Sequence, residues 1–179
     1  MRSAIATTAM ALMLGAGMTL TAQKTTQVHP GKGGSPHVRT SWMVDGANIS
    51  IEYGRPSLKG RSESEVMPPG KEWRTGADEA TTLITDKTLM IGSVTIPAGT
   101  YTLYTVPGAT EWQLVVSKKT GQWGIPYPKG EDAGRTPMKV TKNTKPVEQL
   151  TISVVDTPAG GDLVIEWGTT KATAAFMVH

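Results

Sequence analysis

Two alternating runs on either side of Asp45-Gly46 constrain the fold of this chain more than any other feature. They cover residues 37–44 and 47–53, and each changes between apolar and polar at almost every residue. A period of two is typical of half-buried strands, and the Asp-Gly dipeptide tolerates the positive φ of a type I′ turn. The pattern predicts a β-hairpin over residues 37–53.

Further strand-like runs follow along the chain. They cover residues 81–85, 89–96, 100–106, 112–117, 150–154, 163–167 and 172–178, with turn residues between them. Beyond residue 22 no segment has apolar residues at a sustained period of 3.6, so we expect little or no helix. The chain is predicted to be all-β, a single antiparallel β-sandwich of about nine strands over residues 37–179, immunoglobulin-like or jelly-roll-like. Longer irregular stretches at 54–76 and 121–137 are predicted loops, and binding residues are often found on such loops.

The first 22 residues are typical of a secretory signal peptide. A basic start, Met1-Arg2, precedes an uncharged apolar run over residues 4–20, and Leu20-Thr21-Ala22 fits a cleavage site before Gln23. The alternative, a membrane anchor, is less favoured because the run is short for a bilayer and no basic cluster follows it. Residues 23–36, rich in glycine and with few large apolar residues, are predicted to form a flexible lead-in. We expect an exported protein, periplasmic or secreted, with no membrane span after cleavage.

Composition excludes several classes of function. The chain has no cysteine, which excludes disulfides and a lipid anchor on cysteine. A formal net charge of +3 is too small to predict a nucleic-acid partner. The three histidines do not lie at ligand spacing, so the sequence predicts no metal site and no cofactor. Neither a nucleophile elbow nor a phosphate-binding glycine loop is present, which makes an enzyme the less favoured class.

Charged and aromatic side chains concentrate in residues 53–79 and recur at Trp123. Arginine offers a planar fork suited to carboxylate or phosphate, and an indole offers a face to a sugar or a cation. We therefore predict a binding site for a small polar or anionic molecule, such as a glycan fragment. Its candidate residues are Tyr53, Arg55, Arg61, Lys71, Trp73, Arg74, Asp78, Glu79 and Trp123.

A structural role for the same residues stays open. In that account Arg74 pairs with Glu79, and Trp73 anchors its loop in the core. Of the five tryptophans, Trp42, Trp112 and Trp167 are in phase with apolar neighbours and are predicted to be core residues. Trp73 and Trp123 fall in irregular segments and are predicted to be exposed.

Several short motifs give the chain a resemblance to a bacterial family of secreted domains of unknown function. The matching elements are Ser35-Pro36-His37, Tyr53-Gly54-Arg55-Pro56, Lys59-Gly60-Arg61, Trp73-Arg74-Thr75-Gly76-Ala77-Asp78-Glu79-Ala80-Thr81, Pro97-Ala98-Gly99-Thr100-Tyr101, Pro107 with Glu111-Trp112, and Gly121-Gln122-Trp123-Gly124. The resemblance covers most of residues 35–178. It implies export and one small β domain, and it brings no activity, ligand or catalytic residue.

The sequence leaves three functions open. The first is the binding of a small polar or anionic ligand. The second is a hydrolase or lyase that uses Asp78 or Glu79 as an acid or base, which predicts two carboxyl groups converging in a cleft. The third is a structural or protein-interaction module of the envelope, which predicts an exposed apolar patch or a long unpaired edge strand. The order of the strands and the oligomeric state do not follow from the pattern.

Overall fold

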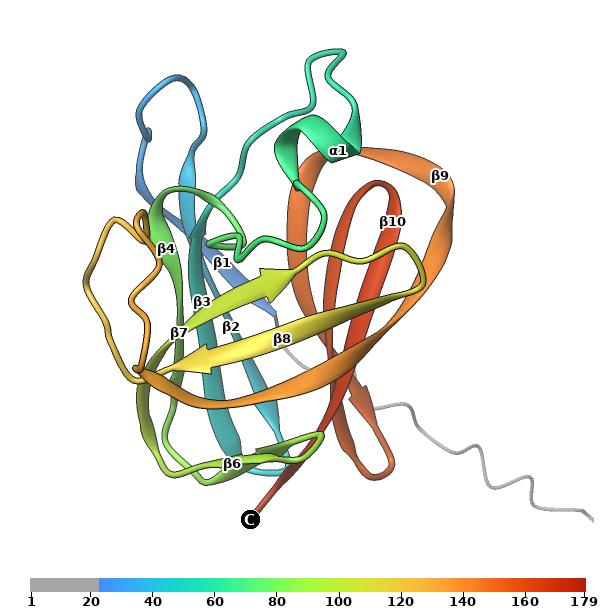
Figure 1. The fold of residues 1–179 in the computed structure, drawn as a ribbon. Helices are drawn as coiled ribbons and strands as arrows, with labels where there is room; N and C mark the ends of the chain where they lie inside the picture. Colours follow the sequence, from blue (N-terminus) through green and yellow to red (C-terminus); the bar gives the residue numbers. More distant parts are fainter. Residues whose placement is uncertain (1–22) are drawn as a thin grey trace, which may run out of the picture.

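Ten antiparallel strands and one short helix form residues 23–179, the part of the chain that the computed structural model describes (Figure 1). The predicted signal peptide, residues 1–22, lies outside the described residues. The elements are β1 (Lys24–His29), β2 (His37–Val44), β3 (Ala47–Gly54), α1 (Glu63–Val66), β4 (Ala77–Thr85), β5 (Leu89–Ile91), β6 (Val94–Ile96), β7 (Gly99–Val106), β8 (Glu111–Ser117), β9 (Asp132–Thr157) and β10 (Gly160–Val178). The all-β prediction is confirmed.

The hairpin predicted around Asp45-Gly46 is the pair β2 and β3. Both turn residues have positive φ, 46° and 73°, as the predicted turn requires. A two-residue loop fixes the register, so Val44 lies opposite Ala47 and His37 lies opposite Gly54 at the far end.

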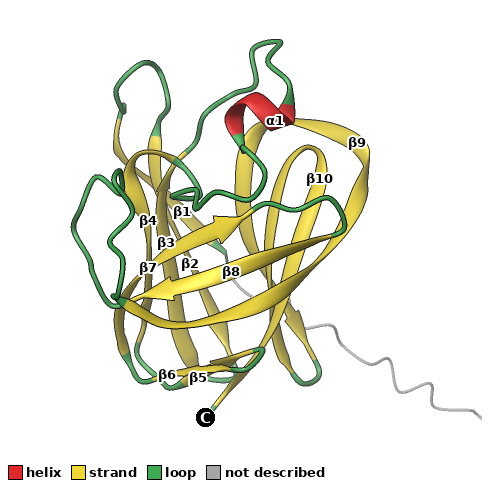
Figure 2. Cartoon of the chain, viewed as in Figure 1, coloured by secondary structure: helices red, strands yellow, loops and turns green. Residues whose placement is uncertain are grey.

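The strand order β1-β2-β3-β4-β7-β8-β9-β10-β5-β6 follows the sequence except for the β5–β6 hairpin, which pairs with β10. One buried cluster joins residues from β2 and β3 to residues from β8, β9 and β10, for example Ile51, Leu114 and Ile152. The sheet therefore folds over on itself and encloses a common core, as Figure 2 shows. Trp42, Trp112 and Trp167 lie in this core, at 2–4% exposure, as predicted.

Two segments differ from the sequence-based expectation. Residues 24–29, predicted to be part of a flexible lead-in, form the edge strand β1, which pairs with β2. Their side chains are mostly exposed on both faces, so no apolar alternation marks them as a strand. Strand β9 runs for 26 residues and begins at Asp132, inside the stretch 121–137 that was predicted to be a loop. Its polar middle, residues 139–149, is likewise mostly exposed. In both cases the strand is stabilised by backbone pairing with a neighbouring strand, β2 for β1 and β10 for β9, rather than by burial of its side chains.

Several of the long loops gather at one end of the molecule. Figure 1 shows the β1–β2 loop, the long β3–β4 connection and α1 at the same end, and the β8–β9 loop beside β4. Within residues 23–179, no helix is both long and apolar enough to cross a membrane.

Candidate functional site

The long β3–β4 connection forms one wall of a cleft of about 360 Å³. This volume lies within the range of small-molecule sites. Three of the predicted residues, Arg61, Trp73 and Arg74, line it, and the other lining residues are Pro56, Glu65, Val66, Pro68, Glu72, Gly76, Ala77, Ile125 and Trp167. The cleft thus joins an aromatic and apolar floor to two arginines and two carboxylates.

Trp73 forms part of the apolar side of the cleft, and it is half-buried rather than exposed as predicted. Its backbone pairs with Thr105 in both directions, at 2.8 and 2.9 Å. Its ring stacks on Trp167 with centroids 5.8 Å apart and meets the edge of Trp112 at 6.4 Å. The core therefore holds this indole rigidly while one part of it faces the cleft.

Arg74 is a half-buried cation without a carboxylate in contact. Its Nη1 donates a hydrogen bond to the Trp123 carbonyl at 3.1 Å, and its guanidinium lies 5.1 Å from the centre of the Trp123 ring. The predicted pair between Arg74 and Glu79 is absent from the ion pairs of residues 23–179. Burial lowers the pKa of Arg74 from its ordinary value, and the more distant charges of Asp78 and Glu79 partly oppose this. The guanidinium is therefore only partly compensated within the protein.

The two carboxylates of the cleft, those of Glu65 and Glu72, accept hydrogen bonds from residues other than the cleft arginines. Glu65 accepts hydrogen bonds from the backbone and hydroxyl of Ser62, both at 2.6 Å, at the start of α1. Glu72 accepts a hydrogen bond from Arg135 at 3.2 Å. Arg61 donates a hydrogen bond from Nε to the Leu58 carbonyl and one from Nη2 to the Ser57 carbonyl. These two bonds fix the position of its guanidinium. Among residues 23–179, no ion pair therefore joins the two arginines of the cleft to its two carboxylates. The hydrogen bonds from Ser62 lower the pKa of Glu65, and the charge of Arg61 contributes to this lowering.

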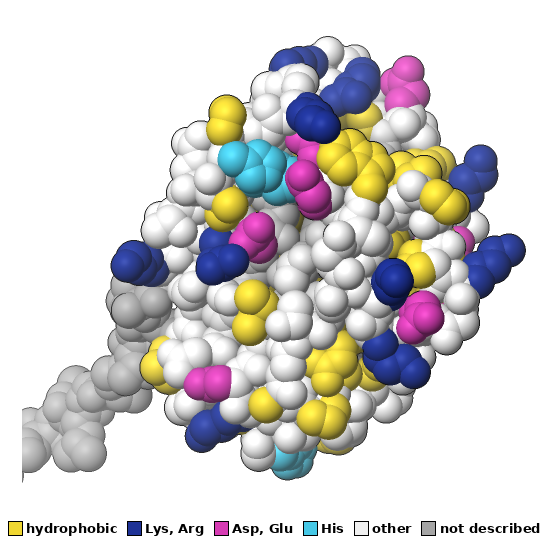
Figure 3. Space-filling model, turned by 90° about the vertical axis from the view of Figure 1, so that its left-hand side faces the viewer, with side chains coloured by type: hydrophobic (Ala, Val, Ile, Leu, Met, Phe, Trp, Pro, Cys, Tyr) yellow, Lys and Arg dark blue, Asp and Glu magenta, His cyan; other side chains and the backbone are white. Residues whose placement is uncertain are grey.

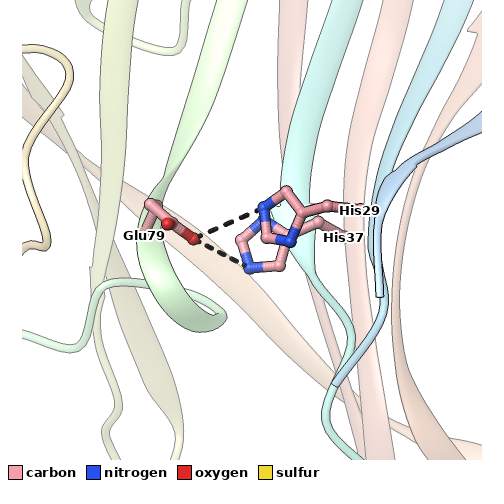
Figure 4. Close-up of side chains that lie close together, drawn as sticks. All are labelled: His29, His37 and Glu79. Atoms are coloured by element: carbon pink, nitrogen blue, oxygen red, sulfur yellow. Dashed lines mark ion pairs between the residues drawn. The ribbon is translucent and has the colours of Figure 1, made fainter. Parts of the chain in front are cut away.

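A second group of charged residues lies outside the cleft lining, where β1, β2 and β4 come together. The imidazoles of His29 and His37 stack with centroids 4.1 Å apart. Glu79 Oε2 lies 3.2 Å from His37 Nε2 and 3.7 Å from His29 Nε2, as Figure 4 shows. Asp78 Oδ2 lies 3.6 Å from the same nitrogen of His37 and accepts a hydrogen bond from the Lys32 backbone N–H at 2.7 Å.

Backbone conformation brings the two carboxylates to one imidazole. Neighbouring side chains of a regular strand point to opposite faces of the sheet. Asp78, however, has φ 60°, in the left-handed region, and the β3–β4 register is broken between Glu52 and Gly54. Because of this irregularity, Asp78 and Glu79 both approach His37. Aspartate is among the residues that tolerate this conformation best.

The remaining predicted residues, Tyr53, Arg55 and Lys71, lie outside both the cleft lining and the histidine cluster. Tyr53 is buried, and its hydroxyl accepts a hydrogen bond from Ile152 N–H at 2.9 Å, so it joins the two sides of the core. Arg55 donates to the Leu150 carbonyl and the Thr151 hydroxyl. Lys71 is exposed and lines no part of the cleft. The cleft and the histidine cluster therefore retain only part of the predicted set.

Trp123 is exposed, as predicted, but it is not a wall of the cleft. The Arg74 guanidinium lies 5.1 Å from the centre of the Trp123 ring, and Lys32 Nζ lies 5.2 Å from it. The ring therefore contacts two cations. Figure 3 shows histidine, acidic, basic and hydrophobic side chains gathered in the upper part of one face.

The β8–β9 loop that carries Trp123 is tied down by Tyr127. Its hydroxyl donates to Asp132, and Arg135 donates both to Asp132 at 2.8 Å and to the Tyr127 hydroxyl at 3.1 Å. Burial, followed by the hydrogen bond and the charge of Asp132, raises the pKa of Tyr127 to about 12. The phenol therefore stays protonated at neutral pH and keeps this contact.

Sequence reasoning missed the two histidines and Lys32. His29 was placed in a flexible segment and His37 at the start of a strand, eight residues apart, with no ligand spacing. One signal was available for His37, because the two-residue turn already puts it opposite Gly54. His37 lies close to His29 because β1 pairs with β2 and the two histidines are register partners. The polar sequence of β1 gives no signal that predicts this pairing.

The fold and these two sites define a small antiparallel β-sandwich with a charged, aromatic-lined end. The model of the family described as "Protein of unknown function (DUF2911)" matches residues 35–176. This chain belongs to that family, in agreement with the resemblance that its motifs show. Searches of curated proteins and of solved structures found no match.

Proposed function

We propose that the protein is exported and binds a small anionic molecule in the cleft beside Arg74, with a carboxylated sugar as the model ligand. The observation that carries the proposal is Arg74, a half-buried residue of the cleft lining whose guanidinium has no carboxylate in contact among residues 23–179. An arginine fork binds carboxylate or phosphate in a planar, bidentate manner.

The rest of the cleft supports this class of ligand. Arg61 adds a second cation at the rim, and the rigid indole of Trp73 supplies a flat apolar surface next to Arg74. A sugar ring has an apolar face that stacks on such an indole, and a carboxylate on the ring adds the negative charge. Glu65 and Glu72, although hydrogen-bonded within the protein, also bring acceptors for hydroxyl groups.

The two alternatives receive less support. A carboxylate-dependent hydrolase or lyase requires two carboxyl groups that converge in a cleft. Asp78 and Glu79 do converge beside His37, but neither lines the cleft that holds Arg74. An interaction module through an unpaired edge requires a long edge strand, whereas the edge strands β1 and β6 have six and three residues. Short edges are a common protection against strand addition.

The test is a titration of the purified protein with glucuronate, followed by tryptophan fluorescence and calorimetry, with glucose and inorganic phosphate in parallel. We expect glucuronate to bind and Arg74→Met to weaken binding at least about tenfold, since a hydrogen bond to a charged group contributes about 1.5–3 kcal/mol. Arg39→Met is the matched control, because Arg39 is a surface arginine paired with Glu52.

Each result decides part of the proposal. If only phosphate binds, the proposal of an anion site is supported and the proposal of a sugar ligand is rejected. Equal binding of glucose and glucuronate, or an unchanged affinity in Arg74→Met, would refute the role of Arg74. Export is checked separately by the intact mass of the protein recovered outside the cytoplasm, which is expected to begin at Gln23.

A further inference from the structure

The Nε2 atom of His37 lies close to two carboxylates but makes no hydrogen bond within the described residues. His37 is 2% exposed, and its Nε2 has no hydrogen-bond partner. Glu79 Oε2 is 3.2 Å away, yet it does not have the geometry of a hydrogen-bond acceptor for this nitrogen. A buried polar atom without a partner is costly, so such an atom indicates either strain or a missing ligand.

Three atoms around this point have the separations of a metal site. Nitrogen atoms of His29 and His37 and an oxygen of Glu79 all lie within 4.8 Å of one another, and the two nitrogen–oxygen distances are 3.2 and 3.7 Å. A tetrahedral ion with bonds of about 2.0–2.2 Å separates its ligand atoms by roughly 3.3–3.6 Å. We propose that His29, His37 and Glu79 bind one divalent transition-metal ion.

The donor set indicates which ions suit the site. Two imidazoles and one carboxylate fit Zn²⁺ and its neighbours rather than Mg²⁺ or Ca²⁺, which take oxygen ligands. Three protein ligands leave a fourth position for water or a small anion. Asp78 adds a negative charge beside His37, but its Oδ2 accepts the Lys32 N–H, so we place it next to the ligand sphere.

Binding requires a movement of His29. The two rings are nearly parallel, at 18°, so one ion cannot lie in the plane of both as they stand. His29 Nδ1 also accepts a hydrogen bond from Gly31 N–H at 3.1 Å, which coordination through Nε2 would break, because Nδ1 must then carry the proton. His29 ends an edge strand and its side chain is 40% exposed, so it is the ligand free to turn.

The site is distinct from the ligand cleft, since none of its three residues lines that cleft. The two proposals therefore stand or fall independently. The charge of Arg74 acts on Asp78 and Glu79, so this cation is expected to limit the affinity of the site for a metal ion.

The test is NMR of the histidine side chains during titration of the purified protein with Zn²⁺, using a cleavable tag without histidine. The chain has three histidines, so the Cε1–H signals of His29 and His37 are expected to shift at one equivalent while His179 serves as an internal control. The Gly31 amide signal is expected to move as well. No shift, or shifts of all three histidines alike, would overturn the proposal.

Calorimetry with matched variants gives the second readout. His29→Gln and Glu79→Gln alter partly exposed side chains and preserve the fold, and each is expected to weaken Zn²⁺ binding by more than tenfold. His179→Gln and Glu131→Gln, of the same residue types and exposed elsewhere, are expected to leave it unchanged. Equal affinity in all four variants would show adventitious binding and reject the site.

Discussion

At the scale of the residue, Gly54 determines whether the histidine cluster can form. A Cβ on Gly54 would lie 2.3 Å from the Ala77 carbonyl oxygen and 2.6 Å from His37 Nε2. The imidazole reaches Glu79 only because the residue opposite it in the hairpin has no side chain. This is the kind of close approach for which strands use glycine.

We predict that Gly54→Ala lowers the free energy of unfolding by about 2–4 kcal/mol, because either the β3–β4 backbones or His37 must move. The control is Gly99→Ala in β7, where a Cβ would make ordinary contacts of 3.4 Å and longer with the Tyr101 ring. Denaturant unfolding of the two variants checks the prediction. A loss in Gly54→Ala no larger than in Gly99→Ala would contradict it.

At the scale of the element, Glu63 fastens α1 to β10. Its carboxylate accepts hydrogen bonds from the backbone and hydroxyl of Thr169, at 2.5 and 2.8 Å, and from the Thr170 hydroxyl. These bonds lie where β10 breaks its pairing with β9 around Gly168, which has φ 60°. Burial alone would raise the pKa of Glu63, but the hydrogen bonds from Thr170 and Thr169 outweigh it and lower the pKa below the ordinary value of 4.5.

We predict that Glu63→Gln lowers the free energy of unfolding by about 2 kcal/mol at neutral pH, since bonds to a charged acceptor are replaced by weaker ones. The unfolded state binds the proton more tightly, so this contribution is present above about pH 4.5 and is lost as the pH falls through the lower folded-state pKa. Thermal unfolding between pH 3 and pH 7 measures it, with Glu111→Gln as a control on an exposed strand end. An acid limb with the same slope in wild type and Glu63→Gln would disprove the assignment.

At the scale of the whole molecule, the segment before the hairpin belongs to the fold. Strand β1 pairs with β2 over residues 24–29, and the following loop donates the Lys32 N–H to Asp78. The family match begins only at residue 35. The edge strand thus extends the folded structure beyond the matched region.

We predict that a chain beginning at Ser35 is less stable than one beginning at Gln23, by on the order of 2 kcal/mol, or roughly 4–8 °C in Tm. The shortened chain also lacks His29 and is expected to lose the Zn²⁺-dependent rise in Tm. Thermal unfolding of both chains with and without Zn²⁺ tests this. Equal Tm values would show that residues 23–34 contribute nothing to stability.

Sequence patterns predicted the parts of the structure that depend on near neighbours. Alternation and Asp45-Gly46 predicted the hairpin, and the same alternation placed Trp42, Trp112 and Trp167 in the core. The stretch 54–76, predicted as a loop, connects β3 to β4 and contains the short helix α1, and three of its candidate residues line the cleft. The structure places Tyr53 in the core with its hydroxyl on Ile152, which the sequence could not show, because a strand-end tyrosine has the same local pattern whether its hydroxyl faces solvent or a distant backbone.

By itself the sequence determined an all-β chain, its first hairpin and the region where charged and aromatic side chains collect, because turn chemistry and side-chain period act over a few residues. Only the tertiary structure decided which side chains meet. His29, His37 and Glu79 belong to three different strands, and their approach depends on the pairing of polar β1 and on the irregular backbone at Asp78. Contacts between distant segments follow from strand order and register across the whole sheet, which local patterns do not encode.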